Sequence, residues 1–251
     1  IVTYSEQKAK EIYEDYRFYD KNVYFYPAKD LLFFQADIHG NLLIRQRMQV
    51  IRALLERQEE ITVVTSIDGC MDYLLPLEKI EKQLIHFRND SGLDMDKLTA
   101  ALVHMGYERV GQVEMPGQFS IRGGIIDIYS LTEENPWRIE LWGDEIDSIR
   151  SFDAQSQRSL ENLDEIAIYP ATELMLSEAR RQDGFARIKK ETKQYAKKLR
   201  EQGNPEAAHR IETQIKEIEE SAQEFGSVVN LESFVHYFYP QTESFLGFFP
   251  P

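Results

Sequence analysis

The sequence predicts an α/β protein with an α+β portion and a helical portion, and three observations carry this prediction. Short apolar runs alternate with helical patterns over residues 1–80, an order that is typical of α/β folds. Between residues 81 and 172, one helical pattern precedes a series of strand-like runs, which is typical of α+β domains. Residues 173–251 hold two long, charged helical patterns and an aromatic tail. These three ranges are the predicted domains.

The first range carries clear start and stop signals. Ser5 is a typical N-cap residue, and Pro27 ends a β-rich run. Because the chain opens on apolar residues that resemble the end of a strand, we expect part of this domain to precede Ile1. The expected elements are a strand end at 1–3, a helix from Glu6 to about Tyr19, a strand at 23–26, a helix at 42–57 and a buried strand at 61–65.

The second range is expected to form mainly antiparallel strands. Asp94 can cap a helix that runs to Met105, and Gly106 stands where a C′ glycine ends a helix. Pro116-Gly117 predicts a hairpin turn, and Gly123-Gly124 indicates a β-bulge or a close backbone approach. The expected strands cover residues 84–87, 107–115, 118–129, 137–142, 145–153 and 166–169.

The third range predicts a helical pair and a buried tail. A helix is expected from Ser177 to about Gln202, and a second from Pro205, which suits a first helical turn, to about Phe225. Their mixed charges predict solvated faces and not a phosphate-binding surface. The aromatic residues between Leu231 and Pro251 need burial, either against the first domain or against residues beyond the end of this chain.

Composition excludes several classes of function. The 251 residues include 29 Lys and Arg against 43 Asp and Glu, a formal net charge of −14, which argues against a chain that mainly grips nucleic acid. The single cysteine, Cys70, excludes an internal disulfide framework and a cysteine-based zinc site. No apolar run approaches the roughly 20 residues of a membrane helix, and no signal segment opens the chain. We expect a cytoplasmic protein with no membrane partner.

Motifs for catalysis do not occur in the sequence. It has no G-x-x-x-x-G-K-[ST] phosphate loop, no H-E-x-x-H pair and no G-x-S-x-G turn. Cys70 has no nearby histidine and is interpreted as a small buried hydrophobic residue. Asp127 and Glu140 could meet across strands, but paired carboxylates are common by chance in an acidic protein. We expect no catalytic residue, metal site or cofactor in this chain.

Two stretches carry a family resemblance. They are Gly106–Tyr129, which includes Phe-Ser-Ile-Arg-Gly-Gly at 119–124, and Trp137–Asp153, which includes Arg-Ile-Glu-Leu-Trp-Gly-Asp-Glu at 138–145. They resemble the module shared by the B subunit of the bacterial excinuclease and the transcription-repair coupling factors. The resemblance implies a partial doubly wound, P-loop-like α/β domain without a phosphate loop. It also implies an inserted α+β antiparallel-sheet domain that binds the excinuclease A subunit, and a helical return segment.

Two departures favour the N-terminal module of the coupling factors. The phosphate loop of a B subunit does not occur, and the stretch between Tyr26 and Leu42 leaves no room for the Tyr-rich hairpin that inserts into DNA. The resemblance then implies a non-catalytic module that recruits repair to stalled transcription and that other domains of the same protein mask. ATP, Mg²⁺, RNA polymerase and DNA would be bound by domains outside this chain. The alternatives are an excinuclease B subunit or helicase fragment with ATP-dependent activity on DNA, and a plain DNA-binding domain.

The resemblance also implies a partner-binding set. Arg109 and Arg122 match exposed arginines of the family, and Ser120 stands where the family commonly has another arginine. Phe119, Gly123 and Gly124 complete the predicted set. Strand alternation predicts that Ser120 and Arg122 point away from the core, with Arg109 within hairpin reach. The alternatives are that the arginines only pair with Glu108 or Glu114, and that the glycines only form a bulge.

Overall fold

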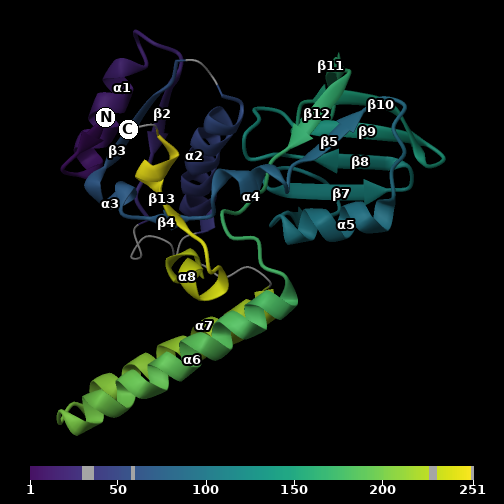
Figure 1. The fold of residues 1–251 in the computed structure, drawn as a ribbon. Helices are drawn as coiled ribbons and strands as arrows, with labels where there is room; N and C mark the ends of the chain where they lie inside the picture. The colour runs from purple at the N-terminus through teal and green to yellow at the C-terminus, as the bar shows by residue number, and fades with distance from the viewer. Residues whose placement is uncertain (30–36, 58–59, 226–230, 250–251) are drawn as a thin grey trace. The chain divides into compact units, whose positions relative to one another are not determined.

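The computed structural model describes residues 1–29, 37–57, 60–225 and 231–249 and shows a mixed α/β fold with several sheets (Figure 1). The described chain forms two compact units. Unit 1 comprises Ile1–Met175 with Glu243–Pro251, and unit 2 comprises Leu176–Thr242. The predicted boundary between residues 80 and 81 therefore falls inside unit 1. The segment 30–36, in which we expected no DNA-binding hairpin, lies outside the described residues.

A three-stranded parallel sheet forms the first part of unit 1, in the order β1-β3-β2. Apolar side chains on one face of the sheet pack with Ala9, Ile12 and Tyr13 of α1. Those on the other face pack with Val50 and Leu54 of α2. Helix α1 ends three residues before Tyr19, and α2 begins five residues before Leu42. The elements are β1 (Val2–Thr3), α1 (Glu6–Tyr16), β2 (Val23–Tyr26), α2 (Asp37–Leu55), β3 (Thr62–Ser66), α3 (Ile67–Cys70), β4 (Tyr73–Leu74) and α4 (Leu77–Glu81).

The C-terminal residues return to this parallel sheet. Strand β13 (Glu243–Ser244) pairs antiparallel with β4, and the short helix η2 (Phe245–Phe248) follows it. The Phe245 ring is 1% exposed and stacks on Tyr26, with ring centroids 3.6 Å apart. The aromatic tail is therefore divided, because Phe238 packs on Phe185 within unit 2.

A six-stranded sheet forms the second part of unit 1, in the order β11-β10-β9-β8-β7-β6. Alternate residues of its central strands are fully buried, among them Phe119, Ile126, Ile139 and Ile149, and they form the apolar face. Its elements, with the separate β5–β12 pair, are β5 (Ile85–Arg88), α5 (Met95–His104), β6 (Glu108–Arg109), β7 (Gln118–Arg122), β8 (Ile125–Ile128), β9 (Trp137–Trp142), β10 (Glu145–Phe152), β11 (Ser159–Leu163) and β12 (Glu165–Ile168).

One turn prediction in this sheet was wrong, and one of the two interpretations of Gly123-Gly124 is confirmed. β6 and β7 are parallel, with Glu108 opposite Gln118, so Pro116-Gly117 does not close a hairpin between them. Instead residues 110–117 form a loop that returns the chain to the start of the parallel pair. Gly117, which precedes β7, has φ = 89°. Gly123-Gly124 is a two-residue turn between the antiparallel strands β7 and β8, and not a bulge. A close backbone approach does occur there, because a Cβ on Gly124 would lie 3.2 Å from the Leu141 carbonyl oxygen.

Unit 2 is built on two long helices. α6 (Glu178–Glu201) begins after Ser177, where the helix was expected to start, and the Ser177 hydroxyl accepts a hydrogen bond from the Arg180 N–H. α7 (Pro205–Phe225) begins at Pro205, as predicted. The short helices η1 (Leu231–Phe234) and α8 (Val235–Phe238) follow. A Cβ on Gly184 would lie 2.1 Å from the Phe238 ring, so the glycine lets α8 approach α6 closely.

Candidate partner-binding surface

Strands β7 to β10 form one sheet face that is polar. Cross-strand register places Arg122 opposite Ile125, Asp127 opposite Arg138, and Arg138 opposite Arg150. Paired residues point to the same side of a sheet, so these side chains share the face opposite the apolar core. We call Arg122, Asp127, Arg138, Glu140 and Arg150 the arginine face.

Asp127 holds two arginines of this face. Its carboxylate is 1% exposed and accepts from Arg122 Nη2 at 2.5 Å and from Arg138 Nε and Nη2 at 2.7 and 2.8 Å. The hydrogen bond that Arg138 donates to Asp127 raises the pKa of Arg138 against the opposing effect of burial. Arg138 also donates to Gln157 Oε1 at 3.0 Å. Two cations thus share one buried carboxylate, which leaves the cluster with a net positive charge.

The open end of the arginine face carries an exposed tryptophan. Trp142 follows Glu140 by two residues on β9 and is 83% exposed. The β7–β8 and β9–β10 turns lie at this same end, because the Leu141 N–H donates to the Gly124 carbonyl at 2.8 Å. Glu140 pairs with Arg150 on the neighbouring strand. Tryptophan and arginine are both enriched among the residues that dominate binding at protein interfaces.

The structure separates the predicted set into exposed and buried members. Arg122 is 44% exposed at its side chain, and Gly123 and Gly124 are exposed beside it. Phe119 is fully buried on the apolar face, and Ser120 is 1% exposed because the 110–117 loop covers it. The Ser120 hydroxyl donates to the Gly111 carbonyl at 3.1 Å. Ser120 therefore lies on the same side of the sheet as Arg122, as alternation predicts, but unlike Arg122 it is covered.

Arg109 lies on β6, at the edge of the sheet, and is exposed. Its register partner is Phe119, so its Cβ belongs to the apolar side and not to the arginine face. The expectation of hairpin reach between Arg109 and Arg122 rested on an antiparallel pair and was wrong. A contact of Arg109 with a partner stays a prediction.

Sequence reasoning did not select Arg138, Arg150 or Trp142. The signal is present in Trp-Arg-Ile-Glu-Leu-Trp at 137–142, because period-two alternation separates Arg138, Glu140 and Trp142 from the buried Ile139. Asp127 and Glu140 do not form a carboxylate pair, since each is neutralised by arginine. The arrangement is suited to recognition rather than to proton transfer.

An ion network joins this domain to the parallel sheet within unit 1. Arg47 of α2 is fully buried and donates from Nε to Glu173 at 2.5 Å and from Nη1 to the Pro27 carbonyl at 2.6 Å. Lys29 Nζ lies 2.6 Å from the same Glu173 carboxylate. Burial opposes the charge on Glu173, but Arg47 and Lys29 outweigh it and lower the pKa of Glu173 to about 2.

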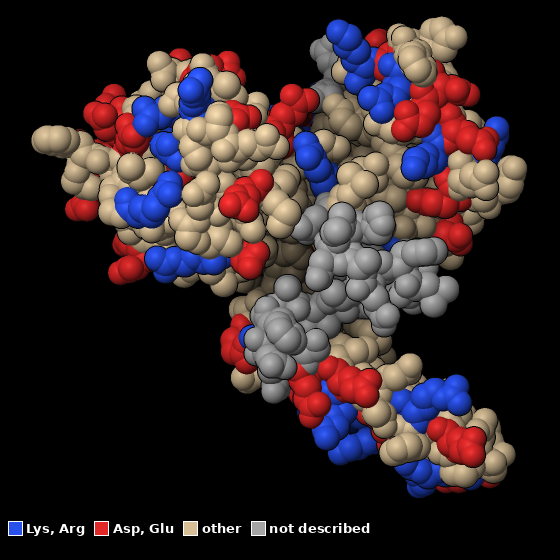
Figure 2. Space-filling view, turned by 180° about the vertical axis from the view of Figure 1, so that it is seen from behind, with Lys and Arg blue, Asp and Glu red and all other residues tan. Residues whose placement is uncertain are grey.

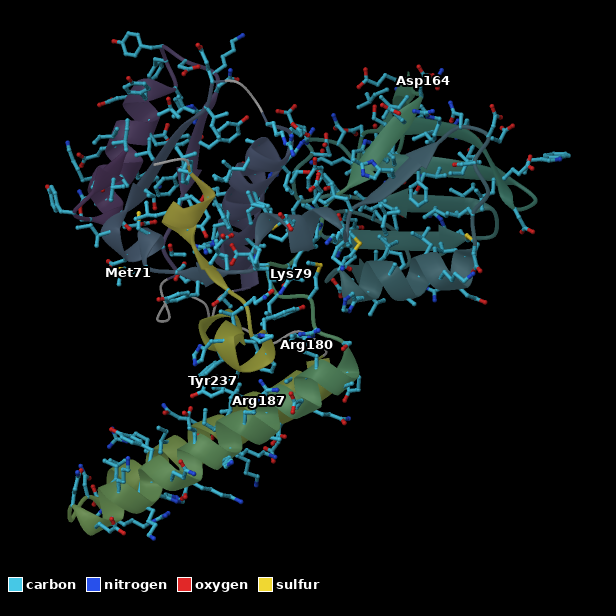
Figure 3. All side chains as sticks on the ribbon, viewed as in Figure 1. Met71, Lys79, Asp164, Arg180, Arg187 and Tyr237 are labelled. Carbon is cyan, nitrogen blue, oxygen red and sulfur yellow. The ribbon has the colours of Figure 1, made fainter. Side chains whose placement is uncertain are left out.

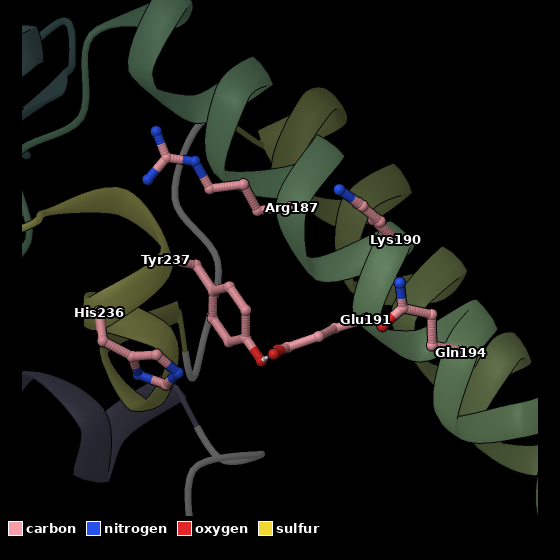
Figure 4. A pocket seen from close by; sticks show the side chains of 6 residues that line it. All are labelled: Arg187, Lys190, Glu191, Gln194, His236 and Tyr237. Carbon is pink, nitrogen blue, oxygen red and sulfur yellow. Dashed lines mark hydrogen bonds between the residues drawn. The ribbon is translucent and has the colours of Figure 1, made fainter. Parts of the chain in front are cut away.

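A pocket of about 550 Å³ lies between α6 and α8 of unit 2 (Figures 3 and 4). The Tyr237 hydroxyl donates to Glu191 across it, and that bond, with partial burial, raises the pKa of Tyr237 to about 12. Arg187 at the same pocket pairs with Asp183 of its own helix. These interactions hold α8 on α6 and supply no reactive group.

The described residues give no support for a metal site or a membrane-spanning helix. Across residues 1–29, 37–57, 60–225 and 231–249, no group of three or more His, Cys, Asp or Glu side chains is placed to hold a metal ion. Within the same ranges, no helix is long and apolar enough to cross a membrane. Cys70 is buried, as expected, and burial raises the pKa of its thiol. Lys and Arg are interspersed with Asp and Glu on the face drawn in Figure 2.

Comparison with known proteins identifies the domain that carries the arginine face. Residues 85–174 match the family model of the UvrB interaction domain, a family whose description names interaction. Along its whole length, the chain is related to the transcription-repair-coupling factors, which confirms the predicted resemblance.

Three relatives show the extent of this similarity. The factor of Bacillus subtilis (strain 168) is 35% identical over 254 residues, which is 100% of this chain and 21% of that protein. The factor of Staphylococcus aureus (strain MRSA252) is 32% identical over 207 residues, 82% of this chain and 17% of that protein. The factor of Staphylococcus haemolyticus (strain JCSC1435) is 36% identical over 156 residues, 62% and 13% respectively. The chain thus spans about a fifth or less of the length of these relatives.

Proposed function

We propose that this chain is a non-catalytic recruitment module that binds the excinuclease A subunit and so couples stalled transcription to nucleotide-excision repair. The observation that supports this most strongly is the arginine face, which lies within the part of the chain that matches the UvrB interaction domain family. The relatives are transcription-repair-coupling factors. A role in repair places the module in the cytoplasm.

Electrostatic attraction would bring the partner to the arginine face, and the Trp142 ring would supply the main apolar contact. Arg122 is the most exposed cation of its cluster, and Asp127 already fixes one side of its guanidinium. The remaining donors can form a bidentate pair with a carboxylate of the partner. Trp142, at the open end of the same face, can bury a large apolar area on contact. An acidic patch with an apolar pocket is the complementary surface.

The rest of the chain would act as a support. We infer that the parallel sheet is part of a doubly wound, P-loop-like domain that no longer binds nucleotide, and that this chain uses no cofactor. ATP, Mg²⁺, RNA polymerase and DNA would contact other parts of the longer protein. Those parts would also mask the arginine face until the protein rearranges.

Titration calorimetry of the chain into purified excinuclease A subunit tests this proposal. We expect saturable binding, and weaker binding of Arg122→Ala by about tenfold, or about 1.4 kcal/mol. Arg109→Ala, assayed beside it, shows whether the sheet edge contributes. Unaltered binding of both variants would leave the partner correct and the surface wrong.

ATP turnover and DNA affinity distinguish the two alternative functions from recruitment. ATP turnover by the purified chain would favour an excinuclease B or helicase fragment. Affinity for duplex DNA that falls steeply with salt would favour a DNA-binding domain. If the folded chain fails to bind the A subunit and residues 81–172 alone also fail, the recruitment proposal is wrong.

A further inference from the structure

Gln157 has an unusual backbone conformation in the turn between β10 and β11. Its φ angle is 60°, in the left-handed region that residues other than glycine rarely adopt. Backbone hydrogen bonds close this turn, because the Gln157 N–H donates to the Asp153 carbonyl at 2.8 Å and the Asp153 N–H donates to the Arg158 carbonyl at 2.9 Å. Such strain persists only where the surrounding contacts hold a residue in place, and it is found most often at functional positions.

The side chain of Gln157 joins three parts of the domain. Its Oε1 accepts a hydrogen bond from Arg138 Nη2 at 3.0 Å, which links the turn to the arginine face. Its Nε2 donates to the Ala154 carbonyl of the same turn at 2.7 Å and to the Val113 carbonyl of the 110–117 loop at 3.5 Å. Because both ends of the amide have partners, the position of Oε1 against Arg138 is fixed.

The Arg138 guanidinium is held from three sides. Its Nε and Nη2 donate to the Asp127 carboxylate at 2.7 and 2.8 Å. Its central carbon lies over the Phe152 ring, 4.4 Å from the centroid, and Gln157 accepts from Nη2 on the remaining side. A guanidinium fixed in this way also fixes the Asp127 carboxylate, because both carboxylate oxygens accept from Arg138.

Arg122 depends on that carboxylate for its orientation. Its Nη2 donates to Asp127 Oδ2 at 2.5 Å, and among the described residues its side chain has no second hydrogen bond or ion pair. We propose that Gln157 is a positioning residue for Arg122. It acts through Arg138 and Asp127 and holds the Arg122 guanidinium in the orientation that binds a carboxylate of the partner. This inference rests on the proposed binding of the excinuclease A subunit, since a contact residue that is already oriented loses less freedom on binding.

Calorimetric titration with the excinuclease A subunit measures the effect on binding. Gln157→Gly is the test variant, because glycine adopts a φ of 60° without strain and so keeps the turn. It should bind about fivefold more weakly than wild type, a size that is typical of residues that act through others. Gln155→Ala changes an exposed glutamine of the same turn and should bind like wild type. Equal affinities of the two variants would overturn the proposal.

A double-mutant cycle separates positioning from a general loss of structure. If Gln157 acts through Arg122, then Gln157→Gly should cause no further loss of affinity in a chain that already carries Arg122→Ala, because the residue that it positions is absent. A loss in the double variant that equals the product of the two single losses would overturn the proposal. It would show that the two residues act independently of each other.

NMR of the arginine side chains tests the positioning without a partner. In the free chain, Gln157→Gly should shift the Nε–H resonance of Arg122 and lower its order parameter, although no hydrogen bond joins these two described residues. Gln155→Ala should leave both quantities unchanged. An unaltered Arg122 resonance and order parameter in Gln157→Gly would overturn this inference, whereas a failure of the wild-type chain to bind the A subunit would contradict the proposed function. The two therefore fail separately.

Discussion

Asp127 organises the arginine face at the scale of single residues. Its carboxylate is 1% exposed, and Arg138, which shares it, is only 14% exposed. We expect Asp127→Ala to lower the free energy of unfolding by about 3 kcal/mol, because it leaves a largely buried guanidinium without its carboxylate. Urea denaturation measures this. Glu165→Ala breaks the exposed pair with Arg88 and should cost about 1 kcal/mol or less; equal losses in the two variants would contradict this account of Asp127.

The low pKa of Glu173 predicts that acid destabilises unit 1. Its pKa in the folded chain is about 2, below the ordinary value of 4.5. The carboxylate therefore stabilises the fold above about pH 4.5, and this contribution is lost as the pH falls toward 2. Glu173→Gln should lose about 3 kcal/mol at neutral pH, because Arg47 and Lys29 lose their shared buried carboxylate and Arg47 keeps only the more exposed Asp72. The difference between wild type and variant, followed by urea denaturation, should shrink below pH 4.5; a constant difference would assign the effect to packing.

Single residues of the site were partly predictable. Alternation along 119–122 correctly gives an exposed Arg122 and a buried Phe119, because it follows from strand geometry alone. It also gives the side of the sheet on which Ser120 lies, but not its burial, because the 110–117 loop covers it. Arg138 could have been selected by the same alternation, but its link to Asp127 depends on strand register.

Secondary structure elements were also predicted only in part. The caps Ser5 and Asp94 were predicted, and each accepts the expected backbone hydrogen bond, because a cap is a local interaction. The parallel pairing of β6 with β7 was not predicted. Pro116-Gly117 marks where the chain turns, but the direction of pairing is set by contacts with the rest of the sheet.

Helix α6 gives a prediction at the scale of elements. Glycine to alanine within a helix ordinarily stabilises by about 1 kcal/mol. At Gly184 the new methyl group would lie 2.1 Å from the Phe238 ring, and overpacking typically costs about 1–3 kcal/mol. We expect Gly184→Ala to destabilise unit 2 in thermal unfolding, whereas Lys193→Ala on an exposed part of α6 should stay within about 0.5 kcal/mol of wild type. A stabilised Gly184→Ala variant would show that α8 does not pack closely on α6.

At the scale of the whole molecule, unit 1 is discontinuous in sequence. Glu243–Pro251 belongs to it although Leu176–Thr242 forms a separate unit. The sequence predicted that the aromatic residues of the tail are buried. It could not assign each of them to a unit, because an apolar residue type indicates burial but not the residues it packs against. Phe245 stacks on Tyr26, more than 200 positions earlier in the chain.

The central claim is that the chain binds the excinuclease A subunit through the arginine face. Calorimetry of Arg122→Ala against Arg88→Ala tests it most directly, because both variants remove one exposed arginine from the same domain. We predict that Arg122→Ala binds about tenfold more weakly, or about 1.4 kcal/mol, and that Arg88→Ala binds like wild type. Equal affinities of the two variants, or no binding by either the folded wild-type chain or residues 81–172 alone, would contradict the account.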